Sequence, residues 1–133
     1  MVYSIEKIRL LTLALKGDKK IFIQLRAEAP AYAALGSALV GSPEAMGWLL
    51  KNDKTLALFV DAVHGNKSAV QILMQEKQYE LAAVSNMLNE DGKAELWLEH
   101  HGLKDYLYFA AAIQIAMDME ERLNLSGYFT LYG

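Results

Sequence analysis

Histidines are the side chains of this chain best suited to acid–base or metal chemistry. His100 and His101 are adjacent and follow Glu99, and we predict that all three lie at the end of a helix, just before Gly102. Successive helical residues point about 100° apart, whereas metal ligands on one helix face lie three or four positions apart. Histidine also interacts favourably with the negative end of the helix dipole. The cluster is therefore predicted to close a helix and not to bind a metal.

The third histidine has a possible carboxylate partner. His64 stands directly before Gly65, and Asp61 precedes it by one helical turn, so the two side chains could share a local hydrogen bond. Catalysis by such a pair would need an activated nucleophile. The nearby hydroxyls of Thr55 and Ser68 belong to no recognisable catalytic motif, so we predict a structural or exposed pair.

Patterns that bind ions or cofactors are weak in this sequence. Asp118, Glu120 and Glu121 gather beside Arg122, but they lack the oxygen-ligand spacing of a calcium loop. The chain contains no cysteine, which excludes disulfides and thiolate-bound metals. Its glycines stand singly and form no phosphate-binding loop after a strand. We therefore predict no catalytic residue, no cofactor and no metal.

Composition indicates one folded domain over residues 1–133. The hydrophobic content of 53% is sufficient to fill a continuous core at this length. No uncharged run approaches the ~18 residues of a membrane span, and charges occupy the place where a signal peptide would need an apolar stretch. We expect a soluble, cytoplasmic protein without a membrane partner.

Charge is distributed unevenly along the chain. Residues 1–51 carry seven Lys or Arg against four Asp or Glu, while residues 52–133 carry six against twelve. Nucleic-acid binding requires a concentrated basic face, and the first half offers only a thin one. This group comprises Lys16, Lys19, Lys20 and Arg26. We predict no nucleic-acid partner.

A spacing of 24 residues organises the chain. Gly17, Gly41 and Gly65 follow it, and an alanine precedes each glycine by three positions. A helix-capping residue follows each glycine and a leucine comes eight positions after it, at Asp18 and Leu25, Ser42 and Leu49, Asn66 and Leu73. A fourth copy at Ala94, Trp97 and Leu98 continues one residue late. Such a period indicates a repeat protein.

Each repeat is predicted to form two short antiparallel helices, since glycine closes one helix and the capping residue begins the next. Helices of about 10 residues are marginal alone and must pack on their neighbours. The expected fold is an all-α solenoid of about four such pairs with a longer C-terminal capping helix. We expect helices at 4–16, 18–28, 31–40, 43–51, 54–64, 66–76, 78–89, 92–101 and 103–124.

Residues 55–74, TLALFVDAVHGNKSAVQILM, resemble the helix–turn–helix of an ankyrin repeat. The correspondence runs through Thr55 and Leu56, then Ala62 before Gly65, and a polar cap at Asn66. Ankyrin repeats are longer than 24 residues and carry a β-hairpin, for which this spacing leaves no room. The resemblance implies short-repeat helix pairs and a protein partner.

One column of polar residues is a candidate partner-binding face. Ser37, Asp61 and Ser85 recur at the same period, and we predict that they lie on the outward side of the first helices, flanked by Thr55 and Tyr79. Stacked equivalent residues form rows, and repeat proteins use such rows to bind partners. Separately, Trp48 and Trp97 occupy equivalent positions beside a core leucine, where an aromatic residue packs or anchors a partner.

The predicted function is that of a non-catalytic protein–protein interaction module. One alternative is a self-assembling structural subunit, which the unequal charge of the two halves and the apolar tail at 127–132 favour. A second, less favoured, is a small-ligand binder or enzyme that uses His64, His100 and His101.

Overall fold

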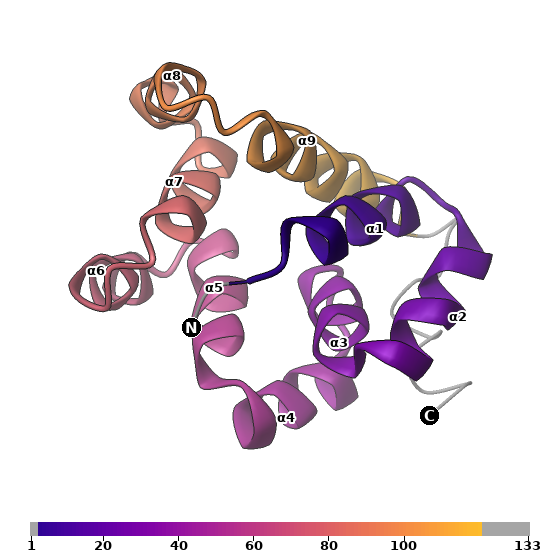
Figure 1. Ribbon diagram of the computed structural model, residues 1–133. Coiled ribbons are helices and arrows are strands. Elements are labelled where there is room, and N and C mark those ends of the chain that lie inside the picture. Colours follow the sequence, from indigo (N-terminus) through magenta and orange to yellow (C-terminus); the bar gives the residue numbers. More distant parts are fainter. Residues whose placement is uncertain (1–2, 121–133) are drawn as a thin grey trace.

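The computed structural model describes residues 3–120, which contain nine α-helices and no strand (Figure 1). The all-α prediction is confirmed. The helices are α1 (Ile5–Leu15), α2 (Lys19–Glu28), α3 (Pro30–Leu39), α4 (Pro43–Asn52), α5 (Lys54–Val63), α6 (Lys67–Gln75), α7 (Tyr79–Leu88), α8 (Gly92–His100) and α9 (Lys104–Asp118). Their bounds lie within a residue of those expected, except that α9 ends at Asp118. The expected extension to 124 and the apolar tail lie partly or wholly outside the described residues.

Helix starts follow from local sequence. Side chains at the predicted caps Asp18, Ser42, Asn66 and Asp91 each accept a hydrogen bond from a backbone N–H of the following turn. The Ser42 Oγ, for example, accepts from the Ala45 N–H at 3.1 Å. A cap of this kind satisfies a donor that has no partner inside the helix.

Helix ends use one recurring turn. After α3 the Gly41 N–H donates to the Ala38 carbonyl at 3.0 Å, and the Ser42 N–H donates to the Ser37 carbonyl at 3.0 Å. Gly41 has a φ of 107°, a left-handed conformation that this turn requires. Ser42 thus closes α3 and opens α4. The same pair of bonds ends α6 and α7, where the left-handed residues are Lys77 and Glu90.

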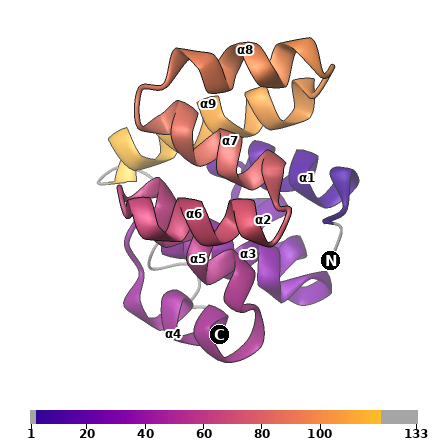
Figure 2. The same ribbon diagram turned by 90° about the vertical axis from the view of Figure 1, so that its left-hand side faces the viewer.

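The helices form two layers around a ring (Figure 1). The inner layer comprises α1, α3, α5, α7 and α9, each packed on the next, and the outer helices α2, α4, α6 and α8 each pack across two successive inner helices. Figure 2 shows α6, α7 and α8 one above another on the side that faces the viewer. In an open solenoid the first and last units lie apart, whereas here α9 packs along α1 and the inner layer closes on itself.

The core lies between the inner helices and beneath the outer ones. Leu25, Leu49, Leu73 and Leu98, one from each outer helix, are fully buried. Burial of each leucine stabilises the fold by about 1.5–3 kcal/mol. Inside the ring Phe59 of α5 stacks on Phe109 of α9, with ring centroids 6.0 Å apart. Equivalent leucines therefore hold every outer helix to the ring.

Two contacts bring inner helices together at their ends. On one side Arg9 of α1 meets Asp105 of α9, with Nε–Oδ1 and Nη2–Oδ2 distances of 2.9 and 3.1 Å. The hydrogen bonds from Arg9 lower the pKa of Asp105. On the same side the Tyr3 hydroxyl donates to Asp53 Oδ1 at 3.1 Å, in front of α5. The N-terminal parts of α1 and α9 and the start of α5 therefore lie close to one another.

Candidate functional site

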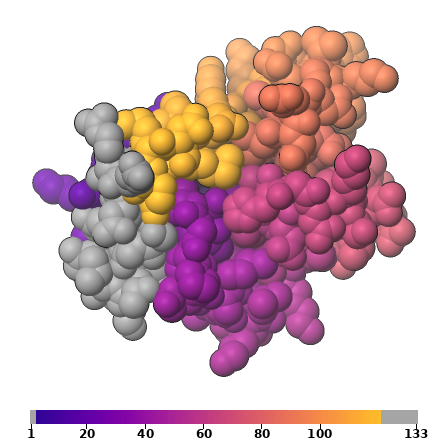
Figure 3. All heavy atoms as spheres, turned by 180° about the vertical axis from the view of Figure 1, so that it is seen from behind, coloured from indigo at the N-terminus to yellow at the C-terminus, as the bar shows by residue number. Residues whose placement is uncertain are grey.

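A groove of about 450 Å³ lies between the outer helices α6 and α8, above the inner helix α7. Figure 3 shows, from behind, that these outer helices project as separate ridges. Met74 comes from α6 and Trp97 from α8, while Tyr79 and Ala83 come from α7. The lining consists of Met74, Tyr79, Ala83, Asn86, Asp91, Lys93, Ala94 and Trp97.

Small residues leave the groove open. Ala83 on α7 and Ala94 on α8 are both 8% exposed, so their short side chains are covered at the bottom of the groove. The residue of α5 that corresponds to Ala83, 25 positions earlier, is Leu58, a larger side chain that is half-buried. The depth of the groove between α6 and α8 therefore depends on an alanine at this place in α7.

Large apolar side chains stand exposed at the groove. Met74 is 47% exposed and Tyr79 is 42% exposed, while Trp97 is half-buried against the core. Asp91 and Lys93 add one charge of each sign at the rim, and Asp91 is held in place because its carboxylate accepts from the Lys93 N–H at 2.9 Å. An apolar floor with a fixed polar rim is typical of a binding surface.

Of the five residues predicted to bind a partner, only Tyr79 lies in this groove. The expected outward placement of Ser37 and Ser85 is wrong, because both are fully buried between helices. The Ser85 Oγ donates to the Ala82 carbonyl at 2.8 Å, which satisfies the hydroxyl within its own helix. A small hydroxyl that bonds to the backbone fits a tight helix crossing, and this is why a polar residue can occupy the buried face.

The remaining two predicted residues lie at opposite ends of α5. Thr55 is half-buried in its first turn, on the same side of the ring as Asp53. Asp61 is half-buried near the last turn and shares a small hollow with His64 and Gly41. The predicted row therefore does not form one continuous surface.

His64 ties two inner helices together. Its Nε2 donates to the Leu39 carbonyl at 2.8 Å, at the end of α3. In the next unit Asn89 does the same, since its Nδ2 donates to the Ala62 and Val63 carbonyls at 3.1 and 3.4 Å at the end of α5. Each side chain thus adds a donor to carbonyls at the end of the preceding inner helix, among which Ala62 also accepts from the Gly65 N–H. This contact gives His64 a structural role.

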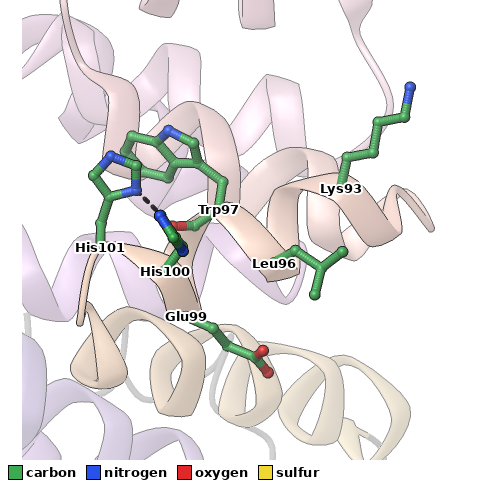
Figure 4. A pocket seen from close by; sticks show the side chains of 6 residues that line it. All are labelled: Lys93, Leu96, Trp97, Glu99, His100 and His101. Carbon is green, nitrogen blue, oxygen red and sulfur yellow. Dashed lines mark hydrogen bonds between the residues drawn. The ribbon is translucent and has the colours of Figure 1, made fainter.

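His100 and His101 lie on the outer surface of α8 (Figure 4). As expected, α8 ends at His100. His101 Nδ1 donates to the Trp97 carbonyl at 2.8 Å, and its ring lies 4.3 Å from the Trp97 ring. The shallow hollow around them is lined by residues of this helix and its end alone: Lys93, Leu96, Trp97, Glu99, His100 and His101. This hollow therefore brings no group from another helix close to the two histidines.

The remaining titratable features do not suggest chemistry. Burial raises the pKa of the Tyr106 hydroxyl to about 12, and burial together with the Asp53 charge raises the pKa of Tyr3 further, so both stay protonated at neutral pH. Asp118 is exposed and Glu120 half-buried, while Glu121 and Arg122 lie outside the described residues. Between residues 3 and 120 no group of three or more acidic or histidine side chains could hold a metal ion.

Sequence reasoning named Tyr79 and Trp97 but missed the groove that joins them. Met74, Asn86, Asp91 and Lys93 carry no shared motif, and three helices bring them together. The available signal was that α7 has an alanine, Ala83, at the place where α5 has the larger Leu58. Such a change marks a gap only once the packing of the outer helices is known.

Comparison with known proteins found no matching family model, no matching curated protein and no matching solved structure. In the part of the chain that the structure describes, no helix combines the length and apolar character needed to cross a membrane.

Proposed function

We propose that this chain is a non-catalytic protein-interaction module whose groove between α6 and α8 receives an apolar side chain from an amphipathic helix of a partner protein. The observation that carries the proposal is the groove itself, in which the exposed side chains of Met74 and Tyr79 lie beside the covered Ala83. Clustered exposed apolar side chains with a polar rim mark interaction sites.

A helix suits the groove because the fold already contains this kind of contact. Each outer helix inserts a leucine, such as Leu73 of α6, between two inner helices. A partner helix would insert its apolar side chain between two outer helices in the same way, and the Asp91 and Lys93 charges at the rim would fix its direction. The resemblance of residues 55–74 to an ankyrin repeat supports a protein partner.

An enzymatic role has less support. His64 donates to the Leu39 carbonyl, and His101 donates to the Trp97 carbonyl of its own helix. His64 shares its hollow with Gly41 and Asp61, while the other two histidines lie on α8. Catalysis by the three histidines would require them to converge on one bound substrate.

The groove has a built-in spectroscopic reporter. The chain has two tryptophans, Trp48 and Trp97, so the Trp48→Phe variant reports from the groove alone. Peptides that form amphipathic helices are selected from a displayed library on this variant. We expect selected peptides to change the Trp97 emission as an apolar side chain covers the indole.

Two further substitutions test the location of binding. Ala83→Leu copies the residue of α5 and should fill the floor, weakening peptide binding at least about tenfold, while Met74→Glu should add a desolvated charge with similar effect. Tyr108→Ala is the matched control, since Tyr108 is 60% exposed on α9, away from the groove. Equal affinity for the Ala83→Leu variant and the parent, or a selection that yields no binder, would refute the proposal.

A further inference from the structure

The first and last outer helices carry opposite charges on their exposed surfaces. Residues 16–28, which include α2, contain four cations and two anions, and Lys16, Lys19 and Lys20 are exposed. Residues 90–101, which include α8, contain four acidic residues and one lysine. Glu95 and Glu99 are exposed on α8. The two surfaces are therefore electrostatically complementary.

Each of these surfaces also has an exposed aliphatic side chain at the same place in the repeat. Ile23 lies two residues before the buried Leu25 of α2, and Leu96 lies two residues before the buried Leu98 of α8. Ile23 is 40% exposed and Leu96 is 63% exposed, the highest value among the exposed large hydrophobic residues of the described chain.

The middle outer helices differ at this position. The corresponding residues are Gly47 in α4 and Gln71 in α6, neither of which offers an aliphatic side chain. Terminal units of a repeat protein usually have a polar outer face, which keeps the molecule monomeric. Among the four outer helices, only α2 and α8 have an aliphatic residue at this position. These are also the two helices whose exposed surfaces carry opposite net charge.

Because the inner helices close into a ring, the α2 surface and the α8 surface point away from each other. Figure 1 places α2 and α8 on different sides of the molecule, with α1 and α9 between them. One chain therefore cannot pair its own α2 surface with its own α8 surface. Two chains can, and each would keep one surface free for the next copy. Such a head-to-tail contact builds open chains or closed rings of subunits.

We propose that this protein self-associates head to tail, with the basic α2 surface of one copy bound to the acidic α8 surface of the next. Ile23 and Leu96 form the apolar centre of the contact, and Lys16, Lys19 and Lys20 face Glu95 and Glu99 around it. The contact leaves Met74, Tyr79 and Ala83 outside it, so it goes beyond the partner-binding groove.

Charge reversal distinguishes this arrangement from other modes of association. The α2-reversed variant carries Lys16→Glu and Lys20→Glu, and the α8-reversed variant carries Glu95→Lys and Glu99→Lys. Sedimentation velocity over a concentration series measures association of each at about 0.1 M and about 1 M salt, where charges are screened beyond about 10 Å and 3 Å. A Lys51→Glu and Lys54→Glu variant matches the first in net charge, at exposed positions outside both surfaces.

We expect the parent and the control variant to associate at low salt and to dissociate at high salt. Each reversed variant should remain monomeric, because its two surfaces now have the same sign. An equimolar mixture of the two reversed variants should associate again. A contact between like surfaces would involve α2 alone or α8 alone, so only one of the two reversals would change it. A reversed variant that associates as the parent does would overturn the proposal, as would a parent that stays monomeric at low salt.

Circular dichroism checks whether the reversed variants are folded. Should one of them unfold, the double variant Ile23→Gln, Leu96→Gln tests the same contact without a change of charge. These neutral substitutions should also abolish association. Persistent association in that variant would contradict the proposed apolar centre. The groove proposal survives either result, since peptide binding at Trp97 is measured on separate variants.

Discussion

Addition of one methyl group at Gly41 should destabilise the protein, whereas the same addition at Gly47 should stabilise it. A Cβ built on either glycine meets no heavy atom within 4 Å, so neither substitution creates a clash. The two positions differ in backbone conformation. Gly41 has a φ of 107° in the turn after α3, while Gly47 lies inside α4.

Magnitudes follow from this difference. Alanine in a left-handed conformation costs about 1–2 kcal/mol, and it regains about 0.5–1 kcal/mol because the unfolded chain becomes less flexible. Gly41→Ala should therefore lower the free energy of unfolding by about 1 kcal/mol. Gly47→Ala should raise it by about 1 kcal/mol, since alanine is the better helix former. At the unfolding entropy typical of this length, each change corresponds to about 4 °C in the thermal midpoint.

Glu90 supplies the reverse experiment. It occupies the same turn after α7 with a φ of 68°, so Glu90→Gly should raise stability by up to about 1 kcal/mol. Urea unfolding followed by circular dichroism measures all three variants against the parent. Changes of the same sign at Gly41 and Gly47 would show that the left-handed turn is not what constrains these positions.

Three other substitutions give separate expectations. Asn89→Ala should lower the free energy of unfolding by about 1 kcal/mol in urea, because the Ala62 and Val63 carbonyls lose the side-chain amide that joins them to the end of α7; an unchanged midpoint would contradict this link between inner helices. Burial raises the pKa of Tyr106 in the folded protein to about 12, above its value in the unfolded chain. The stability that the neutral, buried hydroxyl gives the fold is therefore complete below pH 10 and is lost as the pH rises toward 12. Tyr106→Phe should remove up to about 2 kcal/mol of this alkaline loss in urea titrations at successive pH values, since solvent screens part of the effect at the hydroxyl, whereas the exposed Tyr108→Phe should not. Arg9→Gln should leave the thermal midpoint nearly unchanged in a melting experiment, because exposed ion pairs stabilise little; a large drop would show that the ion pair holds α1 to α9.

Helix bounds were predictable because they depend on neighbours in sequence. A residue such as Ser42 ends one helix and begins the next through hydrogen bonds that span five residues or fewer. No distant part of the chain is needed for this choice. The two turns without glycine, at Lys77 and Glu90, show the limit of the rule. Their flanking helices and the same pair of backbone bonds hold the left-handed conformation in the absence of glycine.

Closure of the inner layer could not be predicted from the repeat. The 24-residue period predicts that each unit packs on the next. The angle between successive units decides whether the five inner helices form an open row or a closed ring in which the last contacts the first. Gly36 shows why this angle is hidden in the sequence: a Cβ there would lie 3.0 Å from Leu11 Cδ1, so α3 approaches α1 closely at this point. Such approaches depend on side-chain volumes of two helices together.

The sequence likewise did not determine on which side of its helix each polar residue lies, toward the core or toward solvent. Ser37 and Asp61 occupy equivalent places, yet the serine is buried and the aspartate is half-buried. Ser85 follows Asp61 by 24 residues, but α7 is offset from α5 by 25, so Ser85 corresponds to the buried Val60. Periodicity relates equivalent residues to one another without stating which neighbour they face. Burial followed from size, because a serine hydroxyl can bond to its own helix while a carboxylate requires water or a partner.

Ring closure restricts where this protein can bind anything large. Each inner helix packs on at least two other inner helices and is covered by the outer ones, so α3 and α5 have little surface to offer, while α7 contributes Tyr79 and Ala83 to the groove. The outer helices α6 and α8 retain the exposed apolar side chains Met74 and Leu96, although both helices are held to the ring by a buried leucine. Substitutions on them should therefore change binding with little effect on stability. A loss of fold on changing Met74 or Leu96 would mean that these side chains support the ring, and binding would have to be sought elsewhere.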